Sequence, residues 1–135
     1  MAIFERGELI YWIANEDSFF EVREAKVLNY LPNGEYIIDC DGEIISSVLS
    51  FCMFKHDNYG RKSAYKWAWH FINSEIQKHK LAISELCSEI TEIVGDSEDD
   101  QYKKLKLVAL KDRLEGKLVV LGEMLSQNEA QQQKL

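Results

Sequence analysis

The chain has 135 residues, of which 46% are hydrophobic and 29% are charged, and it contains one proline. This balance is typical of a soluble globular protein and excludes a disordered or linker-rich chain. No apolar run approaches the roughly 20 residues that span a bilayer, and the first residues lack the basic-then-apolar pattern of a signal peptide. We therefore expect no membrane segment and a cytoplasmic location, with reduced thiols at Cys40, Cys52 and Cys87.

The net charge of −7 is unevenly distributed along the chain. Residues 1–60 hold 4 basic and 11 acidic side chains, whereas residues 61–135 hold 12 of each. Because lysine and arginine bind nucleic-acid phosphates, the acidic N-terminal part disfavours duplex binding there. It favours a basic protein partner.

Residues 1–60 read as short strands joined by tight turns. The segments 8–14 and 35–40 look like short strands, and 43–54 supplies one or two more. Segment 19–31 has a mixed alternation that favours a long bent strand, with a helix as the alternative. Asn33-Gly34 and Asp41-Gly42 are hairpin signals. The pattern predicts a small antiparallel SH3-like barrel or sheet over residues 1–60.

From Lys62 the apolar period changes to that of a helix. Apolar residues recur at alternating steps of four and three, with one histidine among them: Tyr65, Trp69, Ile72, Ile76, His79, Ile83, Leu86, Ile90 and Ile93. This heptad seam predicts a helix over about 62–94. Gly95 ends it.

A second helix is predicted over about 100–131, with its N-cap among the polar residues 96–100. The short loop before it implies an antiparallel helical hairpin spanning 61–135. Gly116 and Gly122 are interpreted as sites of close helix approach, and the polar tail from Asn128 is expected to fray. The apolar face of the hairpin is wide enough to need a further cover, which either the sheet or a second copy of the protein could supply. We predict a homodimer through the leucine stripe, whose members are Leu107, Leu110, Leu114, Leu118, Leu121 and Leu125.

The stretch "AYKWAWHF" at 64–71 gathers four aromatic rings with His70. Tyr65 and Trp69 share the heptad seam, whereas Trp67 and Phe71 lie four apart on another face. We interpret the stretch as a joint between the helices and the sheet, with an exposed partner-binding patch as the alternative. His70 points away from both rows and is expected to be exposed.

No local pattern predicts catalysis, a cofactor or a metal site. Cys52, His56 and Asp57 would share one face of a helix, but no second pair of ligands follows at zinc-like spacing. Acidic neighbours raise the pKa of the Cys40 thiol, which is the opposite of what a nucleophile needs. The seven glycines form no phosphate-binding loop.

Two groups of residues could form binding surfaces, or they could be an ordinary solvated surface and core. A basic patch on the second helix would make the chain a nucleic-acid-associated protein, through Lys103, Lys104, Lys106, Lys111 and Arg113. Alternatively, aromatic rings of the sheet could cage a peptide or methylated lysine, with Glu16 and Asp17 as a negative rim. These rings belong to Tyr11, Trp12, Phe19, Phe20, Tyr30 and Tyr36.

The order of the parts adds a resemblance that covers residues 9–68. "YW", then "VREAKVLNYLPNGEYIID", then "SFCMF" running into "GRKSAYKWA" resembles small phage and prophage accessory proteins that couple an SH3-like barrel to helices. The resemblance implies a mobile-element protein that modulates a host or defence protein, in the manner of an anti-CRISPR.

The sequence thus predicts an α+β protein that acts as a non-catalytic protein–protein interaction module. Its acidic sheet would dock onto a basic, nucleic-acid-binding target and imitate phosphate charge. The predicted partner-binding residues are Glu16, Asp17, Glu21, Trp12 and Phe19.

Overall fold

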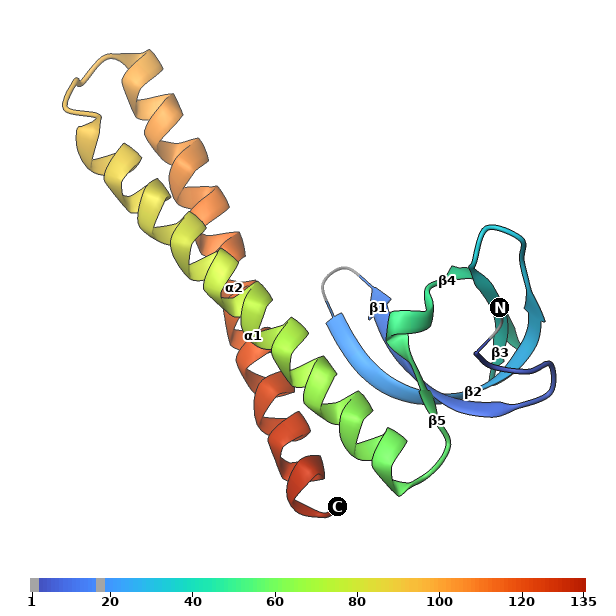
Figure 1. The fold of residues 1–135 in the computed structure, drawn as a ribbon. Coiled ribbons are helices and arrows are strands. Elements are labelled where there is room, and N and C mark those ends of the chain that lie inside the picture. Colours follow the sequence, from blue (N-terminus) through green and yellow to red (C-terminus); the bar gives the residue numbers. More distant parts are fainter. Residues whose placement is uncertain (1–2, 17–18) are drawn as a thin grey trace.

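The computed structural model describes residues 3–16 and 19–135. A five-stranded antiparallel sheet is followed by two long helices (Figure 1), which confirms the α+β class. No helix in the described ranges is long and apolar enough to cross a membrane. The elements are β1 (Leu9–Glu16), β2 (Phe19–Tyr30), β3 (Tyr36–Cys40), β4 (Glu43–Val48), β5 (Met53–Lys55), α1 (Asn58–Glu92) and α2 (Glu98–Gln133).

The sheet has the strand order β4-β3-β2-β1-β5, so β4 and β5 are its two edges. Among the described residues, these two edges do not pair with each other, so the sheet is open. The prediction allowed a closed barrel or a sheet. Segment 19–30 forms a strand, so the helix alternative is wrong. The register shifts between Val27 and Asn29, and β2 curves strongly (Figure 1), as expected when a bulge bends a long strand.

Both predicted glycine turns form. Asp41 and Gly42 have φ values of 52° and 85°, the pair of left-handed conformations that closes a two-residue hairpin between β3 and β4. Asp39 Oδ1 accepts a hydrogen bond of 2.8 Å from the Gly42 N–H and holds this turn.

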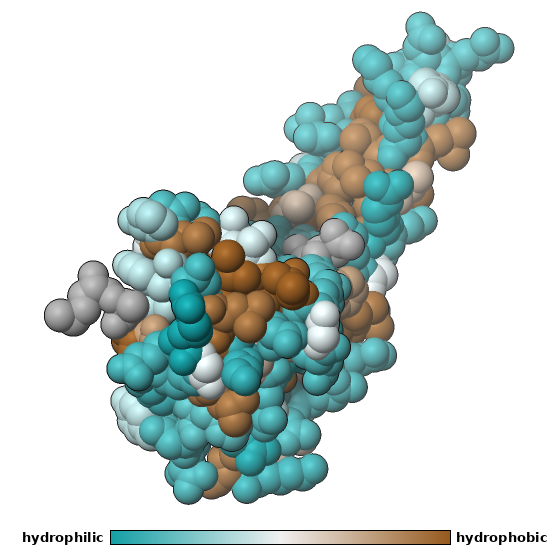
Figure 2. All heavy atoms as spheres, turned by 90° about the vertical axis from the view of Figure 1, so that its right-hand side faces the viewer, coloured by the Kyte–Doolittle hydropathy of each residue, from teal (hydrophilic) through white to brown (hydrophobic). Residues whose placement is uncertain are grey.

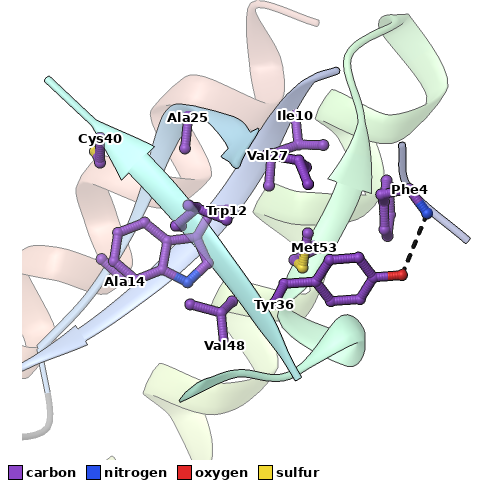
Figure 3. Packing of buried hydrophobic residues seen from close by; sticks show 11 residues of the cluster. Phe4, Ile10, Trp12, Ala14, Ala25, Val27, Tyr36, Cys40, Val48 and Met53 are labelled. Atoms are coloured by element: carbon purple, nitrogen blue, oxygen red, sulfur yellow. Dashed lines mark hydrogen bonds between the residues drawn. The ribbon is translucent and has the colours of Figure 1, made fainter. Parts of the chain in front are cut away.

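The main core lies inside the curve of the sheet (Figure 3). Ile10, Trp12 and Ala14 alternate along β1 and point to this side. Tyr36 is 1% exposed, and its hydroxyl accepts a hydrogen bond of 3.3 Å from the Phe4 N–H. All members of this cluster come from residues 4–53, so its packing stabilises the sheet.

Helix α1 begins four residues before the predicted start. Asp57 is its N-cap and accepts a hydrogen bond of 2.6 Å from the Gly60 N–H. A Cβ at position 60 would collide with the backbone carbonyl of Lys55, so only glycine permits this close approach to β5. None of the nine predicted seam residues is exposed, although α1 ends at Glu92 and Ile93 lies just beyond it.

Helix α2 returns along α1 and brings the end of the chain back to the start of α1 (Figure 1). Ser97 is its N-cap and accepts a hydrogen bond of 3.1 Å from the Asp100 N–H. The tail does not fray, and this expectation was wrong. Asn128 is 7% exposed and donates a hydrogen bond of 3.0 Å to the Tyr65 carbonyl oxygen, so the tail is anchored.

A second core cluster lies between the helices and the sheet. Ile72 and Ile76 of α1 contact Leu121 of α2, and Phe20 of β2 packs against them. Gly116 and Gly122 do not serve close approach within the chain, because a Cβ at either position would have no heavy atom within 4 Å.

Candidate partner-binding site

A cleft of about 430 Å³ opens where the first residues of β2 meet the start of α1 and the end of α2. It joins segments that are up to about a hundred residues apart in sequence. Its apolar lining comes from Phe19, Phe20, Val22, Tyr65 and Met124, and its polar lining from Glu21, Gln127, Asn128 and Gln131.

The apolar side of the cleft is held in place by the joint between sheet and helices. The Phe20 ring packs against the Phe71 ring, with centroids 5.7 Å apart, and both belong to the contact between β2 and α1. Phe19 differs, because 42% of its surface is exposed. Phe19 and Phe20 are neighbours in β2, so their side chains lie on opposite faces of the strand, and the Phe19 ring stays open at the margin of the cleft. An open apolar ring of this kind is suited to bind an apolar side chain of a partner.

The polar side of the cleft combines amides with one carboxylate. The Asn128 side chain already donates to the Tyr65 carbonyl and accepts a hydrogen bond of 2.6 Å from Gln132. Glu21 pairs with Arg23 at 2.9 Å, yet its side chain remains 66% exposed. Glu21 can therefore accept a further hydrogen bond from a partner's cation or N–H group.

The structure brings only part of the predicted partner-binding set to this cleft. Phe19 and Glu21 line it, and Glu16 is exposed at the end of β1. Trp12 is 9% exposed inside the main core, so we remove it from the proposed contact surface. Asp17 lies outside the described residues.

Sequence reasoning missed the helical half of the cleft. Asn128 and Gln132 continue the phase of Leu121 and Leu125, at steps of four, three and four. That continuation could have predicted that these amides face α1 instead of fraying. Met124, Gln127 and Gln131 gave no comparable signal.

The aromatic side chains at 64–71 lie on different faces of α1, as their helical phase predicts, but Trp67 contributes less to the joint with the sheet than expected. Trp69 donates a hydrogen bond of 3.0 Å from Nε1 to Glu129 Oε1 of α2, and His70 is exposed. Phe71 contacts the sheet through Phe20, whereas Trp67 is 51% exposed and stacks mainly on its own helix. The joint therefore depends on Phe71 more than on Trp67.

The aromatic residues of the sheet do not gather into one cage. Trp12 and Tyr36 belong to the main core, with Tyr30 packed against it, whereas Phe19 and Phe20 line the cleft. The Tyr11 ring stacks on the His56 ring at 4.6 Å. Most of these rings therefore serve packing.

Two of the three cysteines, Cys40 and Cys52, have the properties of packed thiols, whereas Cys87 is exposed. Burial raises the pKa of the Cys40 thiol, and the neighbouring Asp41 carboxylate raises it further. Burial also raises the pKa of Cys52. Among the described residues, no group of three or more histidine, cysteine or acidic side chains could hold a metal ion.

The predicted basic patch lies on the part of α2 that is far from the sheet. Lys103, Lys104, Lys106 and Arg113 are exposed, and the ammonium of Lys106 lies 4.8 Å from the centre of the Tyr102 ring. Lys111 pairs with Glu115 at 3.4 Å. The patch is thus accessible and partly neutralised by its own helix.

The predicted dimer stripe is divided between two environments. Leu121 is 2% exposed, and Leu118, Leu121 and Leu125 all belong to the second core cluster with α1. These three leucines have little surface left for a second copy. Leu107 and Leu114 are half-buried, and Leu110 is 43% exposed.

Comparison of the chain with protein-family models, with curated proteins and with solved structures finds no match.

Proposed function

We propose that this chain is a non-catalytic protein–protein interaction module that binds an apolar and basic segment of a protein partner in the cleft. The observation that carries this proposal is the pairing of Phe19 with Glu21. They are two residues apart on β2, so their side chains lie on the same side of the strand, and both are open to solvent.

The partner suited to this site carries an apolar side chain followed by a lysine or arginine. The apolar group would cover the Phe19 ring, and the cation would share the Glu21 carboxylate with Arg23. The acidic excess of residues 1–60 adds a longer-range attraction for a basic partner. Binding should therefore weaken as salt rises, because exposed charges are screened.

We infer a target that itself binds nucleic acid, such as a host or defence protein, with the acidic sheet taking the place of phosphates. The resemblance to phage and prophage accessory proteins and the acidic balance support this inference. The strand order and the curved β2 support an SH3-like barrel left open between β4 and β5. Raised thiol pKa values at Cys40 and Cys52 support a non-catalytic role, and three free cysteines support a cytoplasmic location.

Selection from a randomised peptide display library tests the proposal directly. The immobilised protein should enrich peptides that combine an apolar residue with lysine or arginine. Binding of the best peptide, measured by fluorescence anisotropy, should weaken about tenfold for Phe19→Ser and for Glu21→Lys, since each change removes about 1.4 kcal/mol or more.

Ile44→Ser provides a matched control. Ile44 is 69% exposed on the edge strand β4 and does not line the cleft, so its loss should leave binding unchanged. Equal enrichment by wild type and by a Phe19→Ser, Glu21→Lys double variant would refute the proposed function.

A further inference from the structure

The two helices extend beyond the sheet as an arm, which we define as residues 77–117 (Figure 1). Of these residues, all of which the structure describes, only Leu86 is buried. Helices in proteins owe most of their stability to the packing of an apolar face against other elements. Within the described part of the chain, the two helices of the arm pack only on each other, and this contact leaves Leu86 as the one buried residue of the arm.

Large apolar side chains are open to solvent along this arm, and Figure 2 shows apolar surface continuing along the helices between hydrophilic groups. Leu105 is 68% exposed, Tyr102 60%, Leu110 43% and Val108 36%. All four lie on α2, within three turns of one another. Tyr102, Leu105 and Val108 recur every three residues and form an unpartnered face, whereas Leu110 lies on another side of the helix.

The charges of the arm are segregated along its length. Residues 89–100, the acidic tip, hold Glu89, Glu92, Asp96, Glu98, Asp99 and Asp100 and no basic residue. Residues 101–117, the basic shaft, hold Lys103, Lys104, Lys106, Lys111, Arg113 and Lys117 against Asp112 and Glu115. The arm therefore carries on one molecule both halves of a complementary charge pattern.

We propose that a second copy of this chain covers the arm, with the two arms antiparallel so that the acidic tip of each lies beside the basic shaft of the other. A two-fold axis makes this exchange reciprocal, because the same surface then serves both copies. The apolar face on α2 becomes the centre of the contact and the opposite charges its rim.

The size of the arm is sufficient for such a contact. It is about 30 Å long and about 20 Å wide. Such a face approaches the about 800 Å² per partner that stable complexes bury. This arrangement differs from a dimer built on the whole leucine stripe, because Leu118, Leu121 and Leu125 stay with α1 of their own chain.

Sedimentation velocity from about 1 to 100 μM tests the contact. The wild type should pass from a species of 15.7 kDa to one of twice that mass as concentration rises. Leu105→Glu should remain monomeric with unchanged helical circular dichroism, since Leu105 is exposed within the chain. Trp67→Ser, a half-exposed position outside the arm, serves as the control and should dimerise normally.

Two charge-reversal variants make the test specific to this arrangement. The tip variant, Glu89→Lys, Glu92→Lys and Asp96→Lys, places cations near the C-terminus of α1, where the helix dipole favours them. The shaft variant, Lys103→Glu, Lys104→Glu and Lys106→Glu, lies in the second and third turns of α2, where the helix dipole has little effect. Helical circular dichroism of both variants is therefore compared with the wild type, and loss of dimer at unchanged helicity does not reflect an unstable helix.

Each variant alone should be monomeric at concentrations where the wild type dimerises, and an equimolar mixture of the two should restore a dimer. A monomeric wild type at 100 μM, or variants that dimerise alone as the wild type does, would overturn the proposal. Salt-dependent DNA or RNA binding by a monomeric wild type, lost in the shaft variant, would also overturn it and make the shaft a nucleic-acid site.

Discussion

The rings of Phe20 in β2 and Phe71 in α1 pack together with centroids 5.7 Å apart. This pair connects the sheet to the helices and forms the floor beside the cleft, since Phe20 lines it. It also shows which ring of the 64–71 stretch joins the two parts.

Replacing Phe71 by alanine should lower the free energy of unfolding by about 1–3 kcal/mol, below the range for a fully buried phenylalanine because Phe71 is half-buried. Trp67→Ala should cost less, because Trp67 is 51% exposed. Urea denaturation of both variants gives the comparison. A larger loss for Trp67→Ala would show that the joint is centred on Trp67 instead.

Replacing Asn128 by alanine should destabilise the end of α2. The change removes the hydrogen bond to the Tyr65 carbonyl and leaves Gln132 Nε2 without its acceptor, at a cost of about 1–3 kcal/mol. Hydrogen exchange across residues 125–133 should become faster, whereas Gln127→Ala, at an exposed position, should leave it unchanged. Unaltered exchange in the Asn128 variant would mean that the tail is held by other contacts.

Replacement by alanine should change the stability of the protein in opposite directions at Gly60 and at Gly122. Gly60→Ala should destabilise the chain by about 1–3 kcal/mol, because its Cβ would collide with the Lys55 carbonyl. Gly122→Ala should stabilise α2 by up to about 1 kcal/mol, since nothing lies within 4 Å of its added Cβ and alanine is the better helix former. Thermal unfolding of both variants against the wild type checks the pair of signs.

In a thiol-labelling experiment, one cysteine should react fast and the other two slowly. Cys87 is exposed, whereas Cys40 is buried, Cys52 is half-buried, and burial raises the pKa of both of these thiols. Because the thiolate is the reactive form, a disulfide reagent at pH 8 should modify Cys87 first. Adding urea should make all three react, and mass spectrometry of digested protein identifies the order.

The Glu8 carboxylate should contribute stability that depends on pH. Burial alone would raise its pKa, but hydrogen bonds from the Glu5 N–H and from Lys55 outweigh this, so the pKa of Glu8 lies below its ordinary value of 4.5. A lowered folded-state pKa stabilises the fold above pH 4.5, and this contribution is lost as pH falls through the folded-state value.

Glu8→Gln should therefore cost about 0.5–1 kcal/mol near pH 7, and the difference from wild type should shrink below pH 4. Glu43→Gln, at an exposed position on β4, is the control and should change little at either pH. A constant difference across pH 3–7 would contradict the assignment to the ionised carboxylate.

Local signals predicted much of the fold. The Asp41-Gly42 turn, the strand at 19–30 and the heptad seam of α1 each depend on residues close in sequence, and all three form as expected. The start of α1 was placed too late, because Asn58 and Tyr59 carry no apolar period and Asp57 alone marks the cap.

The cleft was only half predictable, for a reason of topology. Phe19 and Glu21 lie close together on one strand. Tyr65 comes from the start of α1, however, and Met124 and Asn128 come from the end of α2. That convergence follows from the return of α2 along α1 and from the direction in which the chain leaves β5. Neither the return of α2 nor the direction of the chain after β5 produces a residue pattern that a short stretch of sequence reveals.

The close contact between Gly60 and Lys55 has a mechanical consequence. Only two residues separate β5 from α1, and at Gly60 no side chain lies between the helix backbone and the Lys55 carbonyl. Because α1 is about 50 Å long, a small change in its direction at this contact would move its far end much further than its start. The residues at this junction therefore set where the arm points.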